Sequence, residues 1–363
     1  MRSRVLFVGR TRYRLPLAGP LARKWDALAE VFELRVLASG TGRDPRFVLV
    51  PPRPLDGPLF YATLPFRVAR ELRSFRPDAV VAQSPFEAAL AALALRATGS
   101  GAKLVVEIHG DWHTATRLYG SRARMLLAPL ADRVALRALR RADAIRAVSQ
   151  FTAALVRDEA GREADAVFTA YTDLGVFARP VEPVPPEPNL LFVGVLERYK
   201  DVEGLAAAWR ELARRLPEAR LRVVGNGRQV AVAEALQREG VRWDRRLEQA
   251  EVARALDEAR ALVLPSASEG LPRIAVEAFL RARPVVATRA GGTPEIVEHE
   301  VTGLLVDRGD PGALADALER VLRDRELAQR LGDAGHAAAT RFLTTPEDFA
   351  ASFRRLVDSV LRP

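Results

Sequence analysis

The 363-residue sequence contains no cysteine, and only three of its 55 basic residues are lysine. Without cysteine the chain can form no disulfide, no thiolate nucleophile and no cysteine-ligated metal site. No apolar run approaches the roughly 20 residues that a membrane-spanning helix needs. The N-terminal apolar run at residues 5–8 is also too short for the core of a signal peptide. We therefore expect a cytoplasmic protein.

Two short sequence motifs are also missing, one built on glycine and one on aspartate. No G-x-G-x-x-G pattern follows the first apolar segment, and the pair Gly225 and Gly227 falls in the middle of the chain. This argues against a nicotinamide-dependent dehydrogenase, because that fingerprint belongs to the first strand–helix turn of the fold. The chain also has no Asp-x-Asp motif of the kind that holds a divalent metal.

Positive charge is concentrated in one half of the sequence. Residues 1–180 hold 28 Lys and Arg against 17 Asp and Glu, whereas residues 181–363 hold 27 against 29. Much of the excess lies in residues 117–146, read as a basic helical stretch, with Phe60, Tyr61 and Phe66 among further basic residues nearby. This pattern is typical of a solvated helix face or of a surface attracted to an anionic membrane. Nucleic acid is disfavoured, because no nucleic-acid-binding module accompanies the charge.

Short apolar segments alternate with helical patterns along the chain, which predicts parallel sheets joined by crossover helices. At this length two domains are expected, with the proline-rich segment 179–189 as a stiff joint between them. The strands expected in the first half are 5–8, 34–38, 79–82, 104–108 and 144–148, and those in the second half are 190–193, 221–224, 261–264 and 284–287.

Two glutamates stand out in the second half. Glu269 lies in a loop of small residues after the apolar segment 261–264, and Glu277 lies eight residues later in a helix expected to begin near Pro272. Because a helix N-terminus presents unpaired backbone N–H groups, the loop at residues 266–271 predicts a site for anionic oxygens such as those of a phosphate.

Three linked motifs in this region resemble one family. The sequence S-x-x-E-G-L-P…E, followed by G-G-T-P-E-I-V and then G-L-L-V, is similar to the donor-sugar half of glycosyltransferase family 4. The resemblance implies the GT-B fold, an α/β arrangement of two Rossmann-like parallel-sheet domains that face each other across a cleft. It assigns residues 1–180 to acceptor binding and 189–345 to nucleotide-sugar binding, with the helix at 346–363 packing back on the first domain.

The resemblance also implies roles for residues on the donor side. Glu269 would contact hydroxyls of the donor sugar and is a candidate catalytic residue, and Glu277 would accept hydrogen bonds from the nucleotide ribose. Lys200 would neutralise the diphosphate, helped by backbone N–H groups near Gly270, Leu271 and Arg273. Val195 stands where the family usually has arginine, and Arg198 is the candidate replacement. Trp243 and the segment 225–227 are candidates for contacting the nucleotide, although Trp243 is equally a candidate for core packing.

On the first domain the resemblance points to His109, in the sequence VVEIHGDWH, as a catalytic residue beside the donor sugar. Asp111, Trp112 and His113 follow it and are candidates for shaping the acceptor site. Gly9, Arg10 and Thr11, in the expected opening loop at residues 9–14, are further candidates on the acceptor side.

The resemblance implies a retaining glycosyltransferase. We expect that it needs neither a metal nor another cofactor, since no Asp-x-Asp motif is present and cationic side chains can neutralise the diphosphate. Its expected partners are a nucleotide-diphosphate sugar, a glycan or lipid-linked acceptor and an anionic membrane surface on the cytoplasmic side, where it would bind peripherally. Two alternatives remain: a nucleotide-sugar 2-epimerase of the same fold, and a nucleotide-sugar-binding protein that has lost transfer.

Overall fold

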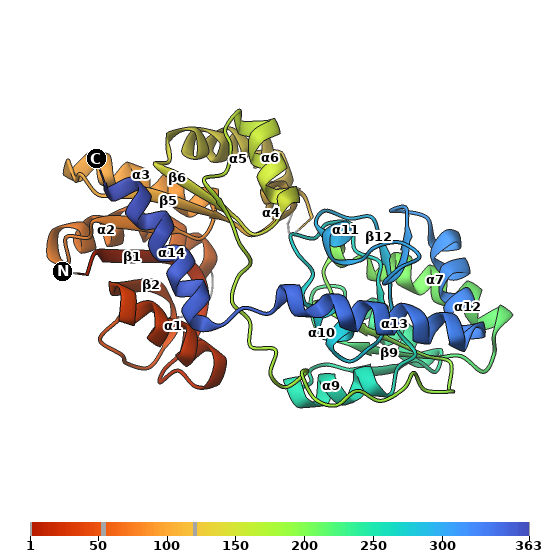
Figure 1. Ribbon diagram of the computed structural model, residues 1–363. Helices are drawn as coiled ribbons and strands as arrows, with labels where there is room; N and C mark the ends of the chain where they lie inside the picture. Colours follow the sequence, from red (N-terminus) through yellow and green to blue (C-terminus); the bar gives the residue numbers. More distant parts are fainter. Residues whose placement is uncertain (1, 52–55, 119–121, 363) are drawn as a thin grey trace. The chain divides into compact units, whose positions relative to one another are not determined.

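The computed structural model describes residues 2–51, 56–118 and 122–362, and these divide into two compact units (Figure 1). Among the described residues, the first unit contains 2–51, 56–116, 122–172 and 344–362, and the second contains 117, 118 and 173–343. Each unit holds one parallel sheet with helices on both faces. The predicted α/β class with two parallel-sheet units is therefore confirmed.

The first sheet has seven strands in the order β3-β2-β1-β4-β5-β6-β7, and its neighbouring strands pair in parallel. Its central strands are nearly continuous apolar runs because both faces are covered. The strand bounds are β1 (Arg4–Arg14), β2 (Glu33–Thr41), β3 (Phe47–Val50), β4 (Ala79–Ala82), β5 (Lys103–Ile108), β6 (Ala144–Ala147) and β7 (Ala166–Val167).

Helices cover both faces of this sheet, as Figure 1 shows. One face carries α2 (Asp56–Ser74), α3 (Pro85–Thr98), α5 (Arg122–Arg141) and α6 (Gln150–Ala160). The other carries α1 (Gly19–Val31) and the C-terminal helix α14 (Pro346–Leu361), whose Phe349 and Phe353 join a buried aromatic cluster with Phe7 and Trp25.

Three expectations for the first unit are wrong. Residues 9–14 are not a loop but continue β1, whose pairing with β2 resumes at Arg12 after a register shift and buries Tyr13. The stretch 117–146 is not one basic helix, because α4 (Trp112–Arg117) and α5 are separate and Arg146 lies fully buried on β6. Phe60 is also fully buried, so it cannot belong to a surface patch.

The second sheet has six parallel strands in the order β10-β9-β8-β11-β12-β13. Helices α7 (Val202–Arg215), α8 (Val230–Arg238), α12 (Pro311–Arg323) and α13 (Arg325–Ala339) line one core, and α9 (Gln249–Asp257), α10 (Arg273–Leu280) and α11 (Thr293–Ile296) line the other. The strand bounds are β8 (Asn189–Val193), β9 (Arg220–Val224), β10 (Arg242–Asp244), β11 (Ala261–Leu264), β12 (Val285–Thr288) and β13 (Gly303–Val306).

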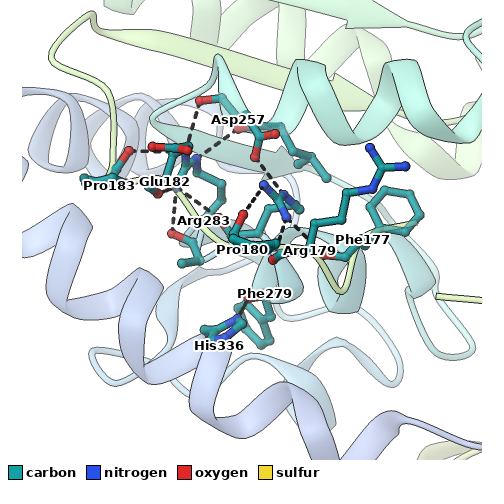
Figure 2. A network of polar contacts seen from close by, with 12 residues as sticks. Phe177, Arg179, Pro180, Glu182, Pro183, Asp257, Phe279, Arg283 and His336 are labelled. Carbon is teal, nitrogen blue, oxygen red and sulfur yellow. Dashed lines mark hydrogen bonds and ion pairs between the residues drawn. The ribbon is translucent and has the colours of Figure 1, made fainter. Parts of the chain in front are cut away.

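The proline-rich segment is bound along the second unit rather than running free. Figure 2 shows Arg283 between this segment and α9, where its guanidinium donates to the carbonyl oxygens of Glu182 (2.9 Å), Pro183 (3.3 Å) and Asp257 (3.0 Å). Arg281 donates in the same way to the carbonyl of Pro180 (3.0 Å). Because proline has no N–H to join a sheet, its carbonyls need donors from side chains, and buried arginines supply them.

Within the described part of the chain, no helix is both long enough and apolar enough to cross a membrane. The expected cytoplasmic location stays a prediction.

Candidate functional site

Lys200 and Glu269 meet where the second sheet reverses its strand order. The order changes direction between β8 and β11, and the loops that leave the carboxyl ends of these two strands carry the two residues. Lys200 Nζ lies 2.5 Å from Glu269 Oε1, and the Ser266 hydroxyl donates to the same oxygen at 2.6 Å. In open parallel sheets this reversal point is where ligands bind.

The loop that carries Glu269 is braced from the neighbouring glycine turn. Thr288, the last residue of β12, donates its hydroxyl to the carbonyl of Ser266 at 2.5 Å. The N–H of Gly292 donates to the carbonyl of Glu269 at 3.0 Å. Gly291 has a φ of +53°, and a Cβ there would lie 1.9 Å from that carbonyl oxygen. The first glycine of the G-G pair in the second motif is thus required by its positive φ and by this close approach.

Lys200 is held by a short 3₁₀ turn, η1 (Arg198–Lys200), that follows β8. The carbonyl of Tyr199 accepts a hydrogen bond from the N–H of Ala267 at 2.7 Å, which ties this turn to the Glu269 loop. Lys200 is only 9% exposed. Its ammonium carries three N–H donors, so the bond to Glu269 orients the group and leaves donors for an anionic ligand.

Glu277 is a buried carboxylate on α10, 3% exposed. Arg273, one turn earlier, places Nε 2.8 Å from Glu277 Oε1. This ion pair is not aligned as a hydrogen bond, and Oε1 has no other hydrogen-bond partner among the described residues. Burial raises the pKa of Glu277, and the charge of Arg273 opposes that rise. A buried carboxylate that lacks donors is suited to accept hydroxyl groups from a ligand.

The N-terminus of α10 lies beside this pair of loops. The helix begins at Arg273, with Pro272 at the cap position, and no described side chain caps it. The start near Pro272 is therefore confirmed. Gly270 and Leu271 precede it in the chain, and the binding of an anion by this backbone stays a prediction.

Two other donor-side candidates take no part in the contact between Lys200 and Glu269. Arg198 is exposed, and its guanidinium makes no ion pair with the described residues. The indole N–H of Trp243, on β10, donates to the carbonyl of Gly225 at 2.9 Å, and the Arg245 guanidinium carbon lies 4.5 Å from its ring centroid. Trp243 thus supports the Gly225 turn, and its contact with a nucleotide stays a prediction.

In the first unit the strand order reverses between β1 and β4, and Gly9 lies at this point. A Cβ on Gly9 would fall 1.9 Å from Oε1 of Gln83, the residue after β4. The Thr11 hydroxyl donates to the same oxygen at 2.9 Å, and Arg10 is exposed. Gln83 thus lies against Gly9, where no side chain would fit, and is hydrogen-bonded to Thr11, at the edge where a ligand is expected.

His109 follows β5 and is about half exposed, with Nε2 3.5 Å from Glu107 Oε1. Glu107 is buried and hydrogen-bonded to Arg146, its partner on the neighbouring strand. Burial raises the pKa of Glu107, but the hydrogen bond and charge of His109 and the charges of Arg146 and Lys24 outweigh burial and lower it to about 2. Glu107 is therefore ionised beside His109.

The residues after His109 divide between surface and core. Asp111 Oδ1 accepts from the backbone N–H of His113 at 2.8 Å and lies 2.9 Å from its Nδ1, while His113 Nε2 lies 3.7 Å from Asp132. Trp112 packs in the hydrophobic core of the first unit, 4% exposed. Contact with an acceptor thus stays a prediction for Asp111, and packing is the role that the structure assigns to Trp112.

Reasoning from the sequence missed five residues that shape these two regions. Ser266 and Thr288 fix the Glu269 loop, Gln83 contacts Gly9, and Glu107 and Arg146 form the ion pair beside His109. The last two had a readable signal, because each is a charged residue inside an otherwise apolar strand, and a buried charge needs a partner.

Comparison with known families covers most of the chain. The model of the glycosyl transferases group 1 matches residues 178–338, and the model of Glycosyltransferase Family 4 matches residues 21–172. Together they include every predicted site residue except Gly9, Arg10 and Thr11.

Curated relatives match a smaller share. A D-inositol 3-phosphate glycosyltransferase of Frankia alni is 36% identical over 181 residues, which is 46% of this chain and 44% of that protein. The protein of the same name from Corynebacterium diphtheriae is 34% identical over 165 residues, 42% of this chain and 38% of its own length. The matched region thus spans less than half the length of these relatives.

Solved structures match over the whole chain. Sucrose-phosphate synthase from Thermosynechococcus elongatus has a TM-score of 0.76 at 21% identity and covers 99% of both chains. Anabaena HepE, solved in complex with UDP-glucose, has a TM-score of 0.69 at 19% identity and also covers 99% of both chains. At this identity the likeness establishes the fold, which is GT-B.

Proposed function

Because this chain belongs to the glycosyltransferases of the family 4 type and has the GT-B fold, we propose that it moves a sugar from a nucleotide-diphosphate sugar to an acceptor hydroxyl. The transfer retains the anomeric configuration and needs no metal. The acceptor class is a glycan or a lipid-linked molecule, and for the latter the enzyme would work peripherally at the cytoplasmic face of a membrane.

The single observation that carries the proposal is the geometry of Glu269. Its Oε1 takes both the Lys200 ammonium and the Ser266 hydroxyl, and no described residue hydrogen-bonds its Oε2. The carboxylate is thus fixed in orientation with one oxygen left to accept hydroxyls. A carboxylate that is already oriented can accept hydrogen bonds from the donor sugar without having to move when the sugar binds.

Lys200 supports the second part of the proposal, stabilisation of the leaving diphosphate. The bond between the anomeric carbon and the phosphate oxygen breaks, the acceptor oxygen forms its bond on the same face, and its proton passes to the departing phosphate. Negative charge grows on the diphosphate during this step, and a buried ammonium group together with a helix N-terminus stabilises such charge. Lys200 and the start of α10 have these properties.

Glu277 and His109 complete the proposal. The Glu277 carboxylate, whose buried Oε1 accepts no hydrogen bond from the described residues, suits the two hydroxyls of a ribose. His109, beside the ionised Glu107 in the first unit, is proposed to contact the donor sugar near its reacting carbon. HepE, with the same fold, was solved with UDP-glucose, so UDP-glucose is the first donor to test.

The experiment is a turnover assay with a panel of nucleotide-sugars and glycan or lipid-linked acceptors, in EDTA. Lys200→Met and Glu269→Gln are compared with Lys103→Met, a half-exposed lysine paired with Asp143. We expect the turnover rate to fall about a hundredfold or more in both site variants, the size typical for the loss of one group that stabilises the transition state. The control should turn over at the wild-type rate. Wild-type rates in the site variants would refute the site.

The same assay separates the alternatives. A product whose anomeric configuration is inverted relative to the donor, or activity that EDTA abolishes, would contradict retention or metal independence respectively. Conversion of the donor to an epimer without any acceptor would identify a 2-epimerase. Tight binding of a nucleotide-sugar without turnover would identify a binding protein.

A further inference from the structure

Helix α5, labelled in Figure 1, carries an unusual set of exposed side chains. Large apolar side chains are exposed along its N-terminal half: Leu126 is 82% exposed, Leu127 60% and Leu130 59%, and Met125 is exposed as well. Exposed leucines are common singly, but several on adjacent turns of one helix form a patch that usually meets a partner.

The C-terminal half of the same face is basic. A groove of about 460 Å³ runs along it, lined by Arg133, Val134, Leu136, Arg137, Arg140 and Arg141. Leu126, Leu130, Arg133 and Arg137 follow the spacing of four, three and four residues that places side chains on one side of a helix. A single stripe on α5 is thus apolar at one end and cationic at the other.

No acidic side chain interrupts this stripe in the described part of α5. Its one acidic residue, Asp132, is largely buried and lies 3.7 Å from His113. The arginines also differ in availability. Arg140 donates to the carbonyl of Ala160 at 3.1 Å, whereas Arg133 and Arg137 are exposed and have no ion-pair partner among the described residues. Positive charge on this face is therefore left without an internal counter-charge.

We propose that this face of α5 docks the protein on an anionic membrane surface. Leu126, Leu127 and Leu130 enter the interface between headgroups and acyl chains, while Arg133 and Arg137 contact lipid phosphates. Helices that lie in the membrane plane combine these two features, buried apolar side chains and attraction to anionic lipid.

The charge distribution favours lipid over a second copy of the chain as the occupant. A twofold contact centred on the leucines would cover the apolar end but would offer the arginines no acidic partner, because the described part of the stripe holds no exposed acidic side chain. A bilayer offers both an apolar layer for the leucines and a phosphate layer for the arginines. The docking uses none of the residues assigned to the donor site, so its test is independent of the test of sugar transfer.

The test is flotation of the full chain with vesicles of phosphatidylcholine, with and without phosphatidylglycerol, at low and high salt. Two variants probe the two ends of the stripe: Leu126→Glu with Leu130→Glu, and Arg133→Gln with Arg137→Gln. The matched controls lie on the other face of the same unit: Leu21→Glu on α1, and Arg354→Gln with Arg355→Gln on α14. Circular dichroism confirms that each variant is folded.

We expect flotation only with phosphatidylglycerol, weakened by salt. The arginine variant should bind roughly thirtyfold more weakly, from two lost contacts near an anionic surface, and the leucine variant should not float. Both controls should float like the wild type. The proposal is overturned if the wild type does not float, or if the α5 variants float as well as the controls. Sedimentation that shows a wild-type dimer and a monomeric α5 variant would assign the face to a second copy instead.

Discussion

The buried ion pair between Glu107 and Arg146 allows a quantitative test of the first unit. The two residues face each other on β5 and β6, and Arg146 is fully buried. Its guanidinium also donates to the carbonyl of Phe168 at 2.8 Å and packs 4.3 Å from that ring's centroid. Arg146→Met keeps much of the aliphatic length but removes the charge, so Glu107 is left buried with weaker partners.

The magnitude follows from the burial of the pair. Removal of one partner of a buried ion pair typically costs about 3–5 kcal/mol, because the other charge remains desolvated. The pKa of Glu107 is lowered to about 2 by His109, Arg146 and Lys24 together, with His109 contributing most, so only part of that shift is lost with Arg146. We therefore expect Arg146→Met to lose about 3 kcal/mol or more.

The pH dependence carries a definite sign. Because folding lowers the pKa of Glu107, its carboxylate stabilises the protein fully above its unfolded pKa, near 4.5, and this contribution is lost as the pH falls toward 2. Urea unfolding of wild type and Arg146→Met should therefore differ most at neutral pH and converge in acid. The double variant Glu107→Gln with Arg146→Met should recover part of the loss. A difference below 1 kcal/mol at pH 7, or one that grows in acid, would refute this reasoning.

Three further outcomes are expected. Glu277→Gln should leave the unliganded protein as stable as the wild type or more stable, because burial disfavours the charge of Glu277 and raises its pKa. Nucleotide binding should weaken. Thermal melts with and without UDP measure both effects, and a clear loss of unliganded stability would contradict the argument. Arg283→Met should lower the unfolding free energy by about 3–5 kcal/mol, since several buried carbonyls lose their donor. Arg289→Met, at a half-exposed arginine, should change it by less than about 0.5 kcal/mol. Equal effects of the two substitutions in urea unfolding would contradict the conclusion that Arg283 holds the proline-rich segment. Gly291→Ala should destabilise the second unit and reduce turnover, because a Cβ would collide with the Glu269 carbonyl, and a variant with normal stability and rate would show that the turn can move.

The parts of the fold that the sequence predicts well are those with strong local signals. Apolar runs identify β4, β8 and β11, because strands covered on both faces are mostly apolar, and they also identify β5, whose apolar run at 104–108 is interrupted only by Glu107. Strands β3, β7, β10 and β13 were not expected. All four are only two to four residues long, so their pairing depends on a neighbouring strand rather than on their own pattern.

The candidate site shows the same division. Glu269, Glu277 and Lys200 are readable because their motifs are linked and ordered along the chain. Ser266 and Thr288 are not, because a serine or threonine after a strand has no distinctive pattern until the loops are folded against each other. Arg146 was misread because the stretch 117–146 holds eight arginines, which suggests an exposed helix. Arg146 instead lies on the short strand β6, between Ile145 and Ala147, where it is buried.

The most direct test of the donor site is the stabilisation of the protein by UDP-glucose in EDTA, measured by calorimetric melting of the wild type, Lys200→Met and Lys103→Met. At a ligand concentration a hundred times the Kd, binding adds about 2.7 kcal/mol to the stability. We expect the wild type and Lys103→Met to melt at a clearly higher temperature with the ligand, and Lys200→Met to show little or no rise. An equal rise in all three proteins would contradict the assignment of Lys200 to the diphosphate of the donor.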